Sequence, residues 1–250
     1  MKSLGIIPAR FASTRFPGKP LVDIDGLSMI QRVYMRAQKA ELLNVVVVAT
    51  DDQRIFEHVQ SFGGNVIMTS PDHNSGTERC GEVTNLLAET FDLVINIQGD
   101  EPFIHPQQID TLIKLMEINK NLNIGTLATV ITDSDSIFNP NHIKVALTPE
   151  NTALYFSRSP IPFLRGIDKP EWIKNHTFYK HIGMYIFRAK VLKEITRLPE
   201  GQLEKAESLE QLRWMENGFK IGVEISDKYS PSVDTPEDLK EILNQIEKYK

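Results

Sequence analysis

Short apolar, β-branched segments alternate with stretches of helical spacing along the first half of the chain, and this alternation restricts the fold more than any other feature. In residues 30–37 and 109–116, apolar side chains recur at the i, i+3, i+4 and i+7 positions of a helix. Strands that are continuously apolar and alternate with helices are typical of a buried parallel sheet. We therefore predict an α/β fold with a mostly parallel central sheet flanked by helices. Its first strands are expected at residues 4–8, 45–50, 66–68 and 93–98.

The second half of the chain follows a different pattern. Pro160 and Pro162 cannot donate to a strand ladder, so residues 156–162 are expected to form a loop or a sheet edge. The polar residues 165–177 predict a surface excursion. Because we find no repeat and no linker, we predict one domain over residues 1–250 with a smaller inserted flap region. Further strands are expected at 124–131, 143–147, 179–188 and 221–225, and helices at 203–217 and from Pro236 onward.

Composition and charge exclude several classes of protein. The 250 residues include 28 Lys and Arg against 33 Asp and Glu, and the net charge of −5 argues against attachment to nucleic acid or anionic lipid by bulk electrostatics. The single cysteine, Cys80, excludes an intrachain disulfide and a thiolate zinc cluster. No apolar run approaches the roughly 18–20 residues of a membrane span, and the N-terminal apolar segment is too short for a signal peptide. We therefore predict a cytoplasmic protein without nucleic-acid or membrane partners.

The loop after the first predicted strand carries three cations among small residues. Arg10, Arg15 and Lys19 stand there with no acidic residue before Asp23, and Gly18 allows a close backbone approach. Loops at the C-terminal ends of parallel strands are where open α/β sheets bind ligands, and three such cations suit a triphosphate. The spacing matches neither a Walker A loop nor G-x-G-x-x-G. A solvated basic loop is therefore the alternative.

Two aspartates at the ends of predicted elements are candidate ligands for a divalent cation. Asp100 follows the fourth strand directly after Gly99, where an unpaired carboxylate costs folding free energy. Asp234 precedes Thr235 and Pro236, which are a good helix start. If the fold brings Asp100 and Asp234 together, they form an oxygen-only site of the kind that Mg²⁺ prefers. The alternatives are an exposed turn for Asp100 and a helix-capping role for Asp234.

The segment Ser75-Gly76-Thr77-Glu78-Arg79 has both a structural and a functional interpretation. A serine ahead of a helix is first of all a cap. The functional alternative is that small residues let a nucleobase lie against free backbone groups, with Arg79 beside it.

Polar residues later in the chain suggest a small pocket wall. His181 and Tyr185 lie on one face of a predicted strand, although a lone strand histidine is more often structural. On the next predicted helix, Glu207 and Gln211 are four residues apart on one face, with Glu210 adjacent. These groups could face sugar hydroxyls, whereas a solvated helix face is the default.

Eight stretches match one family in its own order, from residue 6 to residue 239. They are IIPARFASTRFPGKPL (6–21), VATDD (48–52), SGTERC (75–80), NIQGDEP (96–102), YFSRSPIP (155–162), KHIGMYIFR (180–188), LEQLRW (209–214) and SVDTPEDL (232–239). Together they resemble the 3-deoxy-manno-octulosonate (Kdo) cytidylyltransferases, also called CMP-Kdo synthetases. The opening stretch alone indicates only the wider nucleotidyltransferase fold, whereas the set covers essentially the whole chain and is highly specific.

The resemblance implies a Rossmann-like nucleotidyltransferase fold and the reaction CTP + Kdo → CMP-Kdo + diphosphate, which activates Kdo for lipopolysaccharide synthesis. It implies that Asp100 and Asp234 hold Mg²⁺ as the cofactor. Arg10 and Lys19 would hold the CTP phosphates and, with the two aspartates, carry the catalysis, while Arg15 is a further phosphate contact. The residues implied to border the cytosine are Ala9, Ser75, Arg79 and Gln98.

The resemblance further implies a sugar subsite and a homodimer. Arg158 and Arg165 are the cations expected to meet the Kdo carboxylate. A sugar-binding and dimerisation subregion is expected around residues 140–190. The residues implied to line the sugar pocket are His181, Tyr185, Glu210 and Gln211, with Glu207 as a further candidate.

Three competing functions are weighed against this one. A CMP-sialic acid synthetase would use the same donor with a nine-carbon acid, but the LEQLRW and YFSRSPIP stretches favour Kdo. A non-catalytic nucleotide sensor of the same fold is disfavoured by the intact Lys19, Asp100 and Asp234. A nicotinamide dehydrogenase is disfavoured because no G-x-G-x-x-G follows the first strand.

Overall fold

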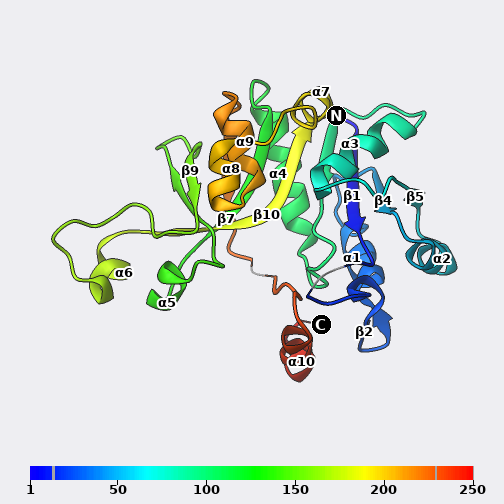
Figure 1. Ribbon diagram of the computed structural model, residues 1–250, viewed down its shortest axis with the longest axis horizontal. Helices are drawn as coiled ribbons and strands as arrows, with labels where there is room; N and C mark the ends of the chain where they lie inside the picture. The colour runs from blue at the N-terminus through cyan, green and yellow to red at the C-terminus, as the bar shows by residue number, and fades with distance from the viewer. Residues whose placement is uncertain (13–14, 229, 250) are drawn as a thin grey trace.

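A mixed, mostly parallel sheet forms the centre of the computed structural model, which describes residues 1–12, 15–228 and 230–249 (Figure 1). Seven of its strands are β1 (Ser3–Ala9), β4 (Val45–Thr50), β5 (Val66–Met68), β6 (Leu93–Asn96), β7 (Ile124–Val130), β10 (Tyr179–Arg188) and β11 (Ile221–Ile225). They lie in the order β11-β7-β10-β6-β1-β4-β5. β10 runs antiparallel to β6 and β7, whereas β1 pairs in parallel with β4 and β6. The predicted sheet is thus confirmed.

Helices cover both faces of the sheet. Because successive strand side chains point to opposite faces, Ile7 of β1 packs in one apolar cluster and Ile6 in the other. Both side chains are fully buried. The first face is covered by α1 (Met29–Ala37), α2 (Gln53–Ser61) and α4 (Pro106–Ile118). The second face is covered by α3 (Gly76–Leu86), α7 (Ala189–Ile195) and α9 (Glu210–Glu216).

Helix starts are set by side chains that accept the free backbone N–H groups of the first turn. Asp52 caps α2 by accepting the Arg54 N–H at 2.9 Å, and Ser75 caps α3 by accepting the Glu78 N–H at 3.2 Å. Thr235 caps α10 (Pro236–Asn244) and forms a capping box with Asp238. The structural interpretation of Ser75 and of Thr235 is therefore confirmed.

The single helix predicted over residues 203–217 is wrong. The segment forms two helices, α8 (Gln202–Glu207) and α9, separated at Ser208. Ser208 adopts a left-handed conformation with φ 51° and ψ 51°, and the next residue, Leu209, is buried in the core. Glu207 and Gln211 consequently do not share one helix face, because Glu207 is the last residue of α8 and Gln211 belongs to α9.

The chain leaves the sheet earlier than predicted at the end of β6. The strand ends at Asn96 rather than at residue 98, and the following loop passes close to the end of β1. A Cβ atom at Gly99 would lie 2.7 Å from the Pro8 carbonyl oxygen, so only glycine fits there. This close approach brings Asp100 beside the loop that follows β1.

Two smaller apolar clusters lie apart from the two that cover the faces of the sheet. The C-terminal segment packs Val233 and Ile242 against Ile24, Met29 and Phe103, which places α10 beside the start of α1 (Figure 1). The surface excursion packs Trp172 against Ile131, Ile137 and Phe178 in a second cluster. Two further strands, β8 (Lys144–Leu147) and β9 (Ala153–Ser157), extend the sheet, because β8 pairs with β10 and β9 pairs with β8. The remaining elements are β2 (Asp23–Ile24), β3 (Leu27–Ser28), α5 (Ser134–Phe138), α6 (Trp172–Asn175) and the 3₁₀ turns η1 (Lys19–Leu21), η2 (Lys169–Glu171) and η3 (Ile246–Lys248).

The prediction of a loop or sheet edge at residues 156–162 is confirmed. Its first two residues complete β9, which pairs only with β8 within the described sheet, and the prolines follow outside the ladder. Among the described residues, none of the helices has the length and apolar character needed to cross a bilayer.

Candidate active site

Lys19 lies between the two aspartates that the sequence singles out. Its ammonium is 2.9 Å from Asp100 Oδ2 and 3.3 Å from Asp234 Oδ1. A backbone hydrogen bond also joins the segments that carry the two aspartates: the Val233 N–H donates to the Asp100 carbonyl at 2.8 Å. The fold therefore brings together two carboxylates that are distant in sequence, as the metal-site hypothesis requires.

The Asp234 carboxylate is not the cap of α10. Thr235 accepts the Asp238 N–H, and the Asp238 carboxylate accepts the N–H groups of Asp234 and Thr235 at 2.9 and 2.8 Å. The Asp234 side chain instead contacts Lys19 and the guanidinium of Arg15, whose Nη2 is 2.9 Å away. The capping alternative for Asp234 is wrong, because Thr235 and Asp238 form the capping box of α10.

The loop between β1 and η1 forms the wall of a cavity of about 380 Å³. Ala9, Arg10, Arg15 and Lys19 line it together with Gln98 and the two aspartates. Gly18, with φ 74°, turns the chain into η1, and its N–H donates to the Phe11 carbonyl at 2.9 Å. Ser13 and Thr14, which belong to the matched opening stretch, lie outside the described residues. The three predicted cations thus share one cavity.

The two carboxylates fit a divalent cation that arrives with a substrate. Both accept from one ammonium, which shows that a positive charge is stabilised between them. Within the described parts of the chain, no group of three or more His, Cys, Asp and Glu side chains forms a metal site. Mg²⁺ is commonly held by one or two carboxylates and by substrate phosphates. Asp100 and Asp234 therefore suit Mg²⁺ bound to a polyphosphate.

A second cavity, of about 290 Å³, adjoins the first at Pro8, Gln98 and Gly99. The Gln98 amide donates to the Gly183 carbonyl at 2.6 Å, which links the loop after β6 to β10. The lining of this second cavity includes four predicted sugar-pocket residues, which are His181, Tyr185, Glu210 and Gln211.

His181 is buried beside a threonine hydroxyl. Burial lowers the pKa of His181 to about 3, so the imidazole is neutral at pH 7. Its Nε2 forms a hydrogen bond with the Thr126 hydroxyl at 2.9 Å, and that hydroxyl also lies 2.8 Å from the Met184 carbonyl and 3.2 Å from the Ile182 carbonyl. These contacts hold the imidazole ring in the wall of the cavity.

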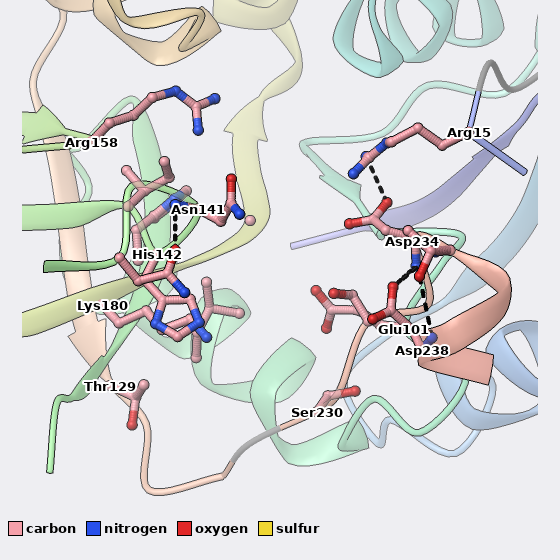
Figure 2. A pocket seen from close by; sticks show the side chains of 17 residues that line it. Arg15, Glu101, Thr129, Asn141, His142, Arg158, Lys180, Ser230, Asp234 and Asp238 are labelled. Atoms are coloured by element: carbon pink, nitrogen blue, oxygen red, sulfur yellow. Dashed lines mark hydrogen bonds and ion pairs between the residues drawn. The ribbon is translucent and has the colours of Figure 1, made fainter. Parts of the chain in front are cut away.

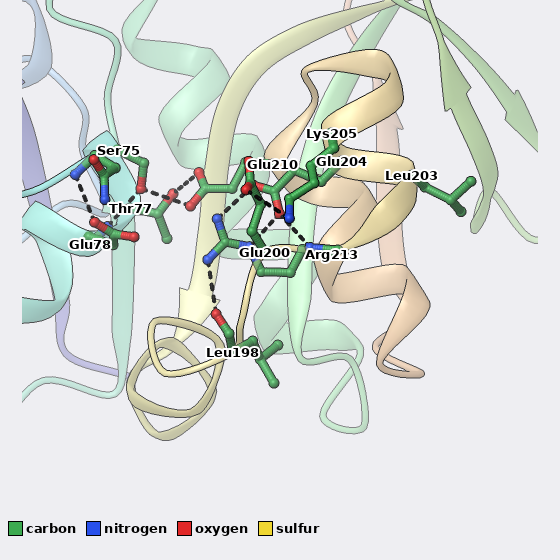
Figure 3. A network of polar contacts seen from close by, with 12 residues as sticks. Ser75, Thr77, Glu78, Leu198, Glu200, Leu203, Glu204, Lys205, Glu210 and Arg213 are labelled. Atoms are coloured by element: carbon green, nitrogen blue, oxygen red, sulfur yellow. Dashed lines mark hydrogen bonds and ion pairs between the residues drawn. The ribbon is translucent and has the colours of Figure 1, made fainter.

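Glu210 is held by the start of α3 (Figure 3). Ser75 and Thr77 donate their hydroxyl protons to the two Glu210 carboxylate oxygens at 2.8 and 2.7 Å. Burial raises the pKa of Glu210, although these hydrogen bonds oppose the shift. The neighbouring Arg213 forms a buried bidentate pair with Glu204 at 2.7 and 2.6 Å. Ser75 thus contacts Glu210 as well as capping α3.

Arg79 is fully buried rather than open to a cavity, with 1% of its surface exposed. Its guanidinium donates to the Thr69 hydroxyl and the Ser70 carbonyl, and it lies 3.4 Å from the Asp51 carboxylate. Arg79 thus joins Thr69 and Ser70, which follow β5, to Asp51 at the end of β4. Its guanidinium does not contact a bound base directly and can act on one only by positioning this segment.

A third and larger cavity, of about 810 Å³, opens between two walls (Figure 2). Arg15, Asp234 and Glu101 stand on one wall, and Arg158 and Lys180 stand on the other. Sequence reasoning missed Glu101 and Lys180. Burial, followed by the adjacent charge of Asp100, raises the pKa of Glu101 to about 8. Only the position of Glu101 directly after Asp100 in the NIQGDEP stretch could have drawn attention to it.

The two arginines predicted to meet a sugar carboxylate differ in their placement. Arg158 lines the large cavity, whereas Arg165 is exposed on the excursion after β9 and is absent from the linings of the three cavities described above. The two are therefore not brought to one place within this chain.

The cytidylyltransferase family model matches residues 4–224 of the chain. This match defines the class of protein to which the chain and its fold belong. The 3-deoxy-manno-octulosonate cytidylyltransferase of Parabacteroides distasonis is 56% identical over 247 residues, which cover 97% of each chain. That of Bacteroides thetaiotaomicron is 54% identical over 96% of each chain.

A solved structure agrees with these relatives. CMP:2-keto-3-deoxy-manno-octonic acid synthetase complexed with CTP superposes with a TM-score of 0.92, at 42% identity and 99% coverage of both chains. The chain belongs to the 3-deoxy-manno-octulosonate cytidylyltransferase family. The resemblance drawn from the eight stretches and the predicted fold class are both confirmed.

Proposed function

We propose that the protein transfers a cytidylyl group from CTP to Kdo, giving CMP-Kdo and diphosphate and so activating Kdo for lipopolysaccharide synthesis. The observation that carries the proposal is the convergence of Asp100 and Asp234 on Lys19 beside the basic loop. This arrangement supplies the charges that a nucleoside triphosphate and its cation need, in a chain of this family.

The nucleotide is assigned to the cavity after β1. Arg10 and Lys19, with Arg15 as a further contact, bind the phosphates, whose charges these cations neutralise. The residues assigned around the cytosine are Ala9, Ser75, Gln98 and, through the segment that it braces, Arg79. Asp100 and Asp234 would hold Mg²⁺, which when bound draws charge from the phosphates and makes the diphosphate a better leaving group.

The sugar acid is assigned to the cavity between β10 and α9. His181, Tyr185, Glu210 and Gln211 line it and offer both donors and acceptors to hydroxyl groups. Arg158 lines the large cavity, which shares His181 and Gly183 with this one. Its guanidinium has five N–H groups. Three of them donate to the carbonyls of Glu207, Pro140 and Ser208. The two that remain match the two oxygens of a carboxylate.

The chemistry needs positioning rather than a covalent enzyme intermediate. The anomeric hydroxyl of Kdo attacks the α-phosphorus of CTP in line, the bond to diphosphate breaks, and the hydroxyl proton passes to water. Lys19 and Arg10 neutralise charge on the phosphates as it shifts toward the leaving diphosphate. Arg158 offsets the repulsion that a second anion, the sugar carboxylate, meets at a polyphosphate. The basic side chains are therefore concentrated at this site in a chain of net charge −5.

The assembly and location are also proposals. We assign residues 1–250 to one nucleotidyltransferase domain, with a sugar-binding and dimerisation subregion around 140–190 and a homodimer as the working assembly. Phe163 and Leu154 support this assignment, because they are 73% and 58% exposed within that subregion. A dimer mass by light scattering supports it, and a monomer mass at working concentration counts against it. A cytoplasmic location follows from the proposed donor CTP, a cytoplasmic nucleotide.

A diphosphate-release assay with CTP, UTP, ATP and GTP tests the proposed donor and activity. With Kdo present, we expect turnover with CTP to exceed that with the other nucleotides by at least about 100-fold in kcat/KM. CTP binding without diphosphate release would instead establish the nucleotide-sensor alternative.

Substitution of Arg158 tests the sugar subsite. Arg158→Ala is expected to raise the KM for Kdo by roughly 10- to 150-fold, because removing a charge-assisted hydrogen bond costs about 1.5–3 kcal/mol. The KM for CTP should change far less. Arg197→Ala, which removes an exposed arginine after α7, is the control and should leave both constants unchanged. An equal effect of Arg158→Ala on both substrates would place Arg158 outside the sugar subsite.

A further inference from the structure

The backbone of Arg158 is clamped by two side chains at the point where a strand ladder stops. β9 pairs with β8 up to the partners Lys144 and Ser157, and Arg158 is the next residue. Its N–H donates to the Glu207 carboxylate at 2.9 Å, and its carbonyl accepts from the Lys144 ammonium at 2.6 Å. Side chains thus supply the two hydrogen bonds that a continued strand would have made.

Lys144 is fully buried, which is unusual for a lysine. Besides the Arg158 carbonyl, its ammonium donates to the Asn139 carbonyl at 2.9 Å. Burial lowers the pKa of Lys144 to about 8, opposed by the negative charge of Glu207. A buried ammonium costs folding free energy unless its donors are satisfied. An apolar side chain at this position in β8 could not donate hydrogen bonds to the Asn139 and Arg158 carbonyls, as Lys144 does.

Glu207 acts on the same residue from the other side. Its second carboxylate oxygen accepts from the Ser157 hydroxyl at 2.6 Å. The Arg158 side chain returns a hydrogen bond from Nε to the Glu207 carbonyl at 2.6 Å, and its Nη2 donates to the Ser208 carbonyl at 3.3 Å. Ser208 is the left-handed break between α8 and α9. The clamp therefore also fixes the start of α9, which carries Glu210.

The segment on the other side of Lys144 lines the large cavity. Asn139, which accepts from Lys144, lies in that lining with Asn141, His142 and Ile143. Lys144 is thereby tied both to this wall and to Arg158, and neither its ammonium nor the Glu207 carboxylate is among the groups lining the cavity.

We infer that Lys144 and Glu207 are a pair of positioning residues for the sugar-acid subsite, holding the backbone of Arg158 so that its free N–H groups face the substrate carboxylate. The inference rests on the proposed function, because it concerns the same subsite. It predicts that loss of either member impairs the binding of the sugar acid and leaves the binding of the nucleotide intact.

Kinetics of Lys144→Met, which keeps the length of the side chain and removes the charge, test the inference. We expect the KM for Kdo to rise about tenfold or more, while the KM for CTP stays within about twofold. Val59→Ala is the matched control, because it removes buried volume beneath the far edge of the sheet on α2. It should lower the melting temperature without changing the KM for Kdo. Equal changes in both Michaelis constants of folded Lys144→Met, or none, would overturn the inference.

A double-mutant cycle separates positioning from direct contact. If Lys144 acts through Arg158, then Lys144→Met combined with Arg158→Ala should be little worse than Arg158→Ala alone. Additive losses would overturn the positioning role. If Lys144→Met does not fold, Glu207→Gln decides the matter in the same assay: a selective rise in the KM for Kdo supports the pair, and unchanged constants refute it. Absence of CMP-Kdo formation by the unmodified protein would refute the proposed function itself, a result distinct from each of these.

Discussion

Asp→Asn substitution at either Asp100 or Asp234 is expected to lower kcat by roughly 10²–10³-fold, and the double variant should be little worse than either single one. The magnitude is that of removing one preorganised electrostatic group from an active site. Non-additivity is expected because residues that act as a unit fail together. Asparagine keeps the size of the side chain and much of its hydrogen bonding, so the change isolates the negative charge. The measurement is kcat as a function of Mg²⁺ concentration for each variant.

Thr235→Ala is the control for helix capping in this experiment. Thr235 caps α10 directly after Asp234, and removing such a cap costs about 1 kcal/mol of stability. We expect a lower melting temperature for Thr235→Ala with an unchanged Mg²⁺ requirement. If Asp234→Asn has an unchanged Mg²⁺ requirement, Asp234 is not a metal ligand.

Lys19→Ala is expected to reduce kcat by about two orders of magnitude or more while the protein stays folded. Lys19 stands between two carboxylates and lines the cavity assigned to the phosphates. Its loss removes a positive charge that would offset the charge of the transferring phosphoryl group. The measurements are kcat by diphosphate release and the circular dichroism spectrum of each variant.

Lys114→Ala is the matched control for Lys19→Ala. Lys114 is exposed on α4, so its loss should change neither kcat nor the spectrum. Near-normal turnover by folded Lys19→Ala would remove Lys19 from the phosphate site and leave the basic loop as a solvated surface.

Most of the sheet could be predicted from local sequence because its strands are short segments rich in apolar and β-branched residues. The ranges 45–50, 66–68, 179–188 and 221–225 agree with the strands of the structure. The break at Ser208 could not be predicted, because helical spacing continues across it in the sequence. What stops the helix there is tertiary: the Arg158 guanidinium binds the Ser208 carbonyl, and Leu209 is buried.

From single residues, the candidate site could be predicted where a charge stands at the end of a strand or directly before a helix. Asp100 and Lys19 follow strands that the apolar pattern defines, and their loops meet because Gly99 approaches Pro8. The hydrogen bonds of Lys144 and Glu207 to the Arg158 backbone could not be predicted. In the sequence Lys144 looks like an ordinary strand residue, and only the fold shows that it is buried. Arg79 illustrates the reverse case. Its place beside a helix cap suggested contact with a base, but its guanidinium is bonded to Thr69 and Ser70 inside the protein.

A competition between two sugar acids tests the central claim most directly. The protein is incubated with CTP, Mg²⁺ and equal concentrations of Kdo and sialic acid, and the products are identified by mass spectrometry. The account predicts CMP-Kdo with stoichiometric release of diphosphate, and no CMP-sialic acid. Formation of CMP-sialic acid in place of CMP-Kdo would contradict it.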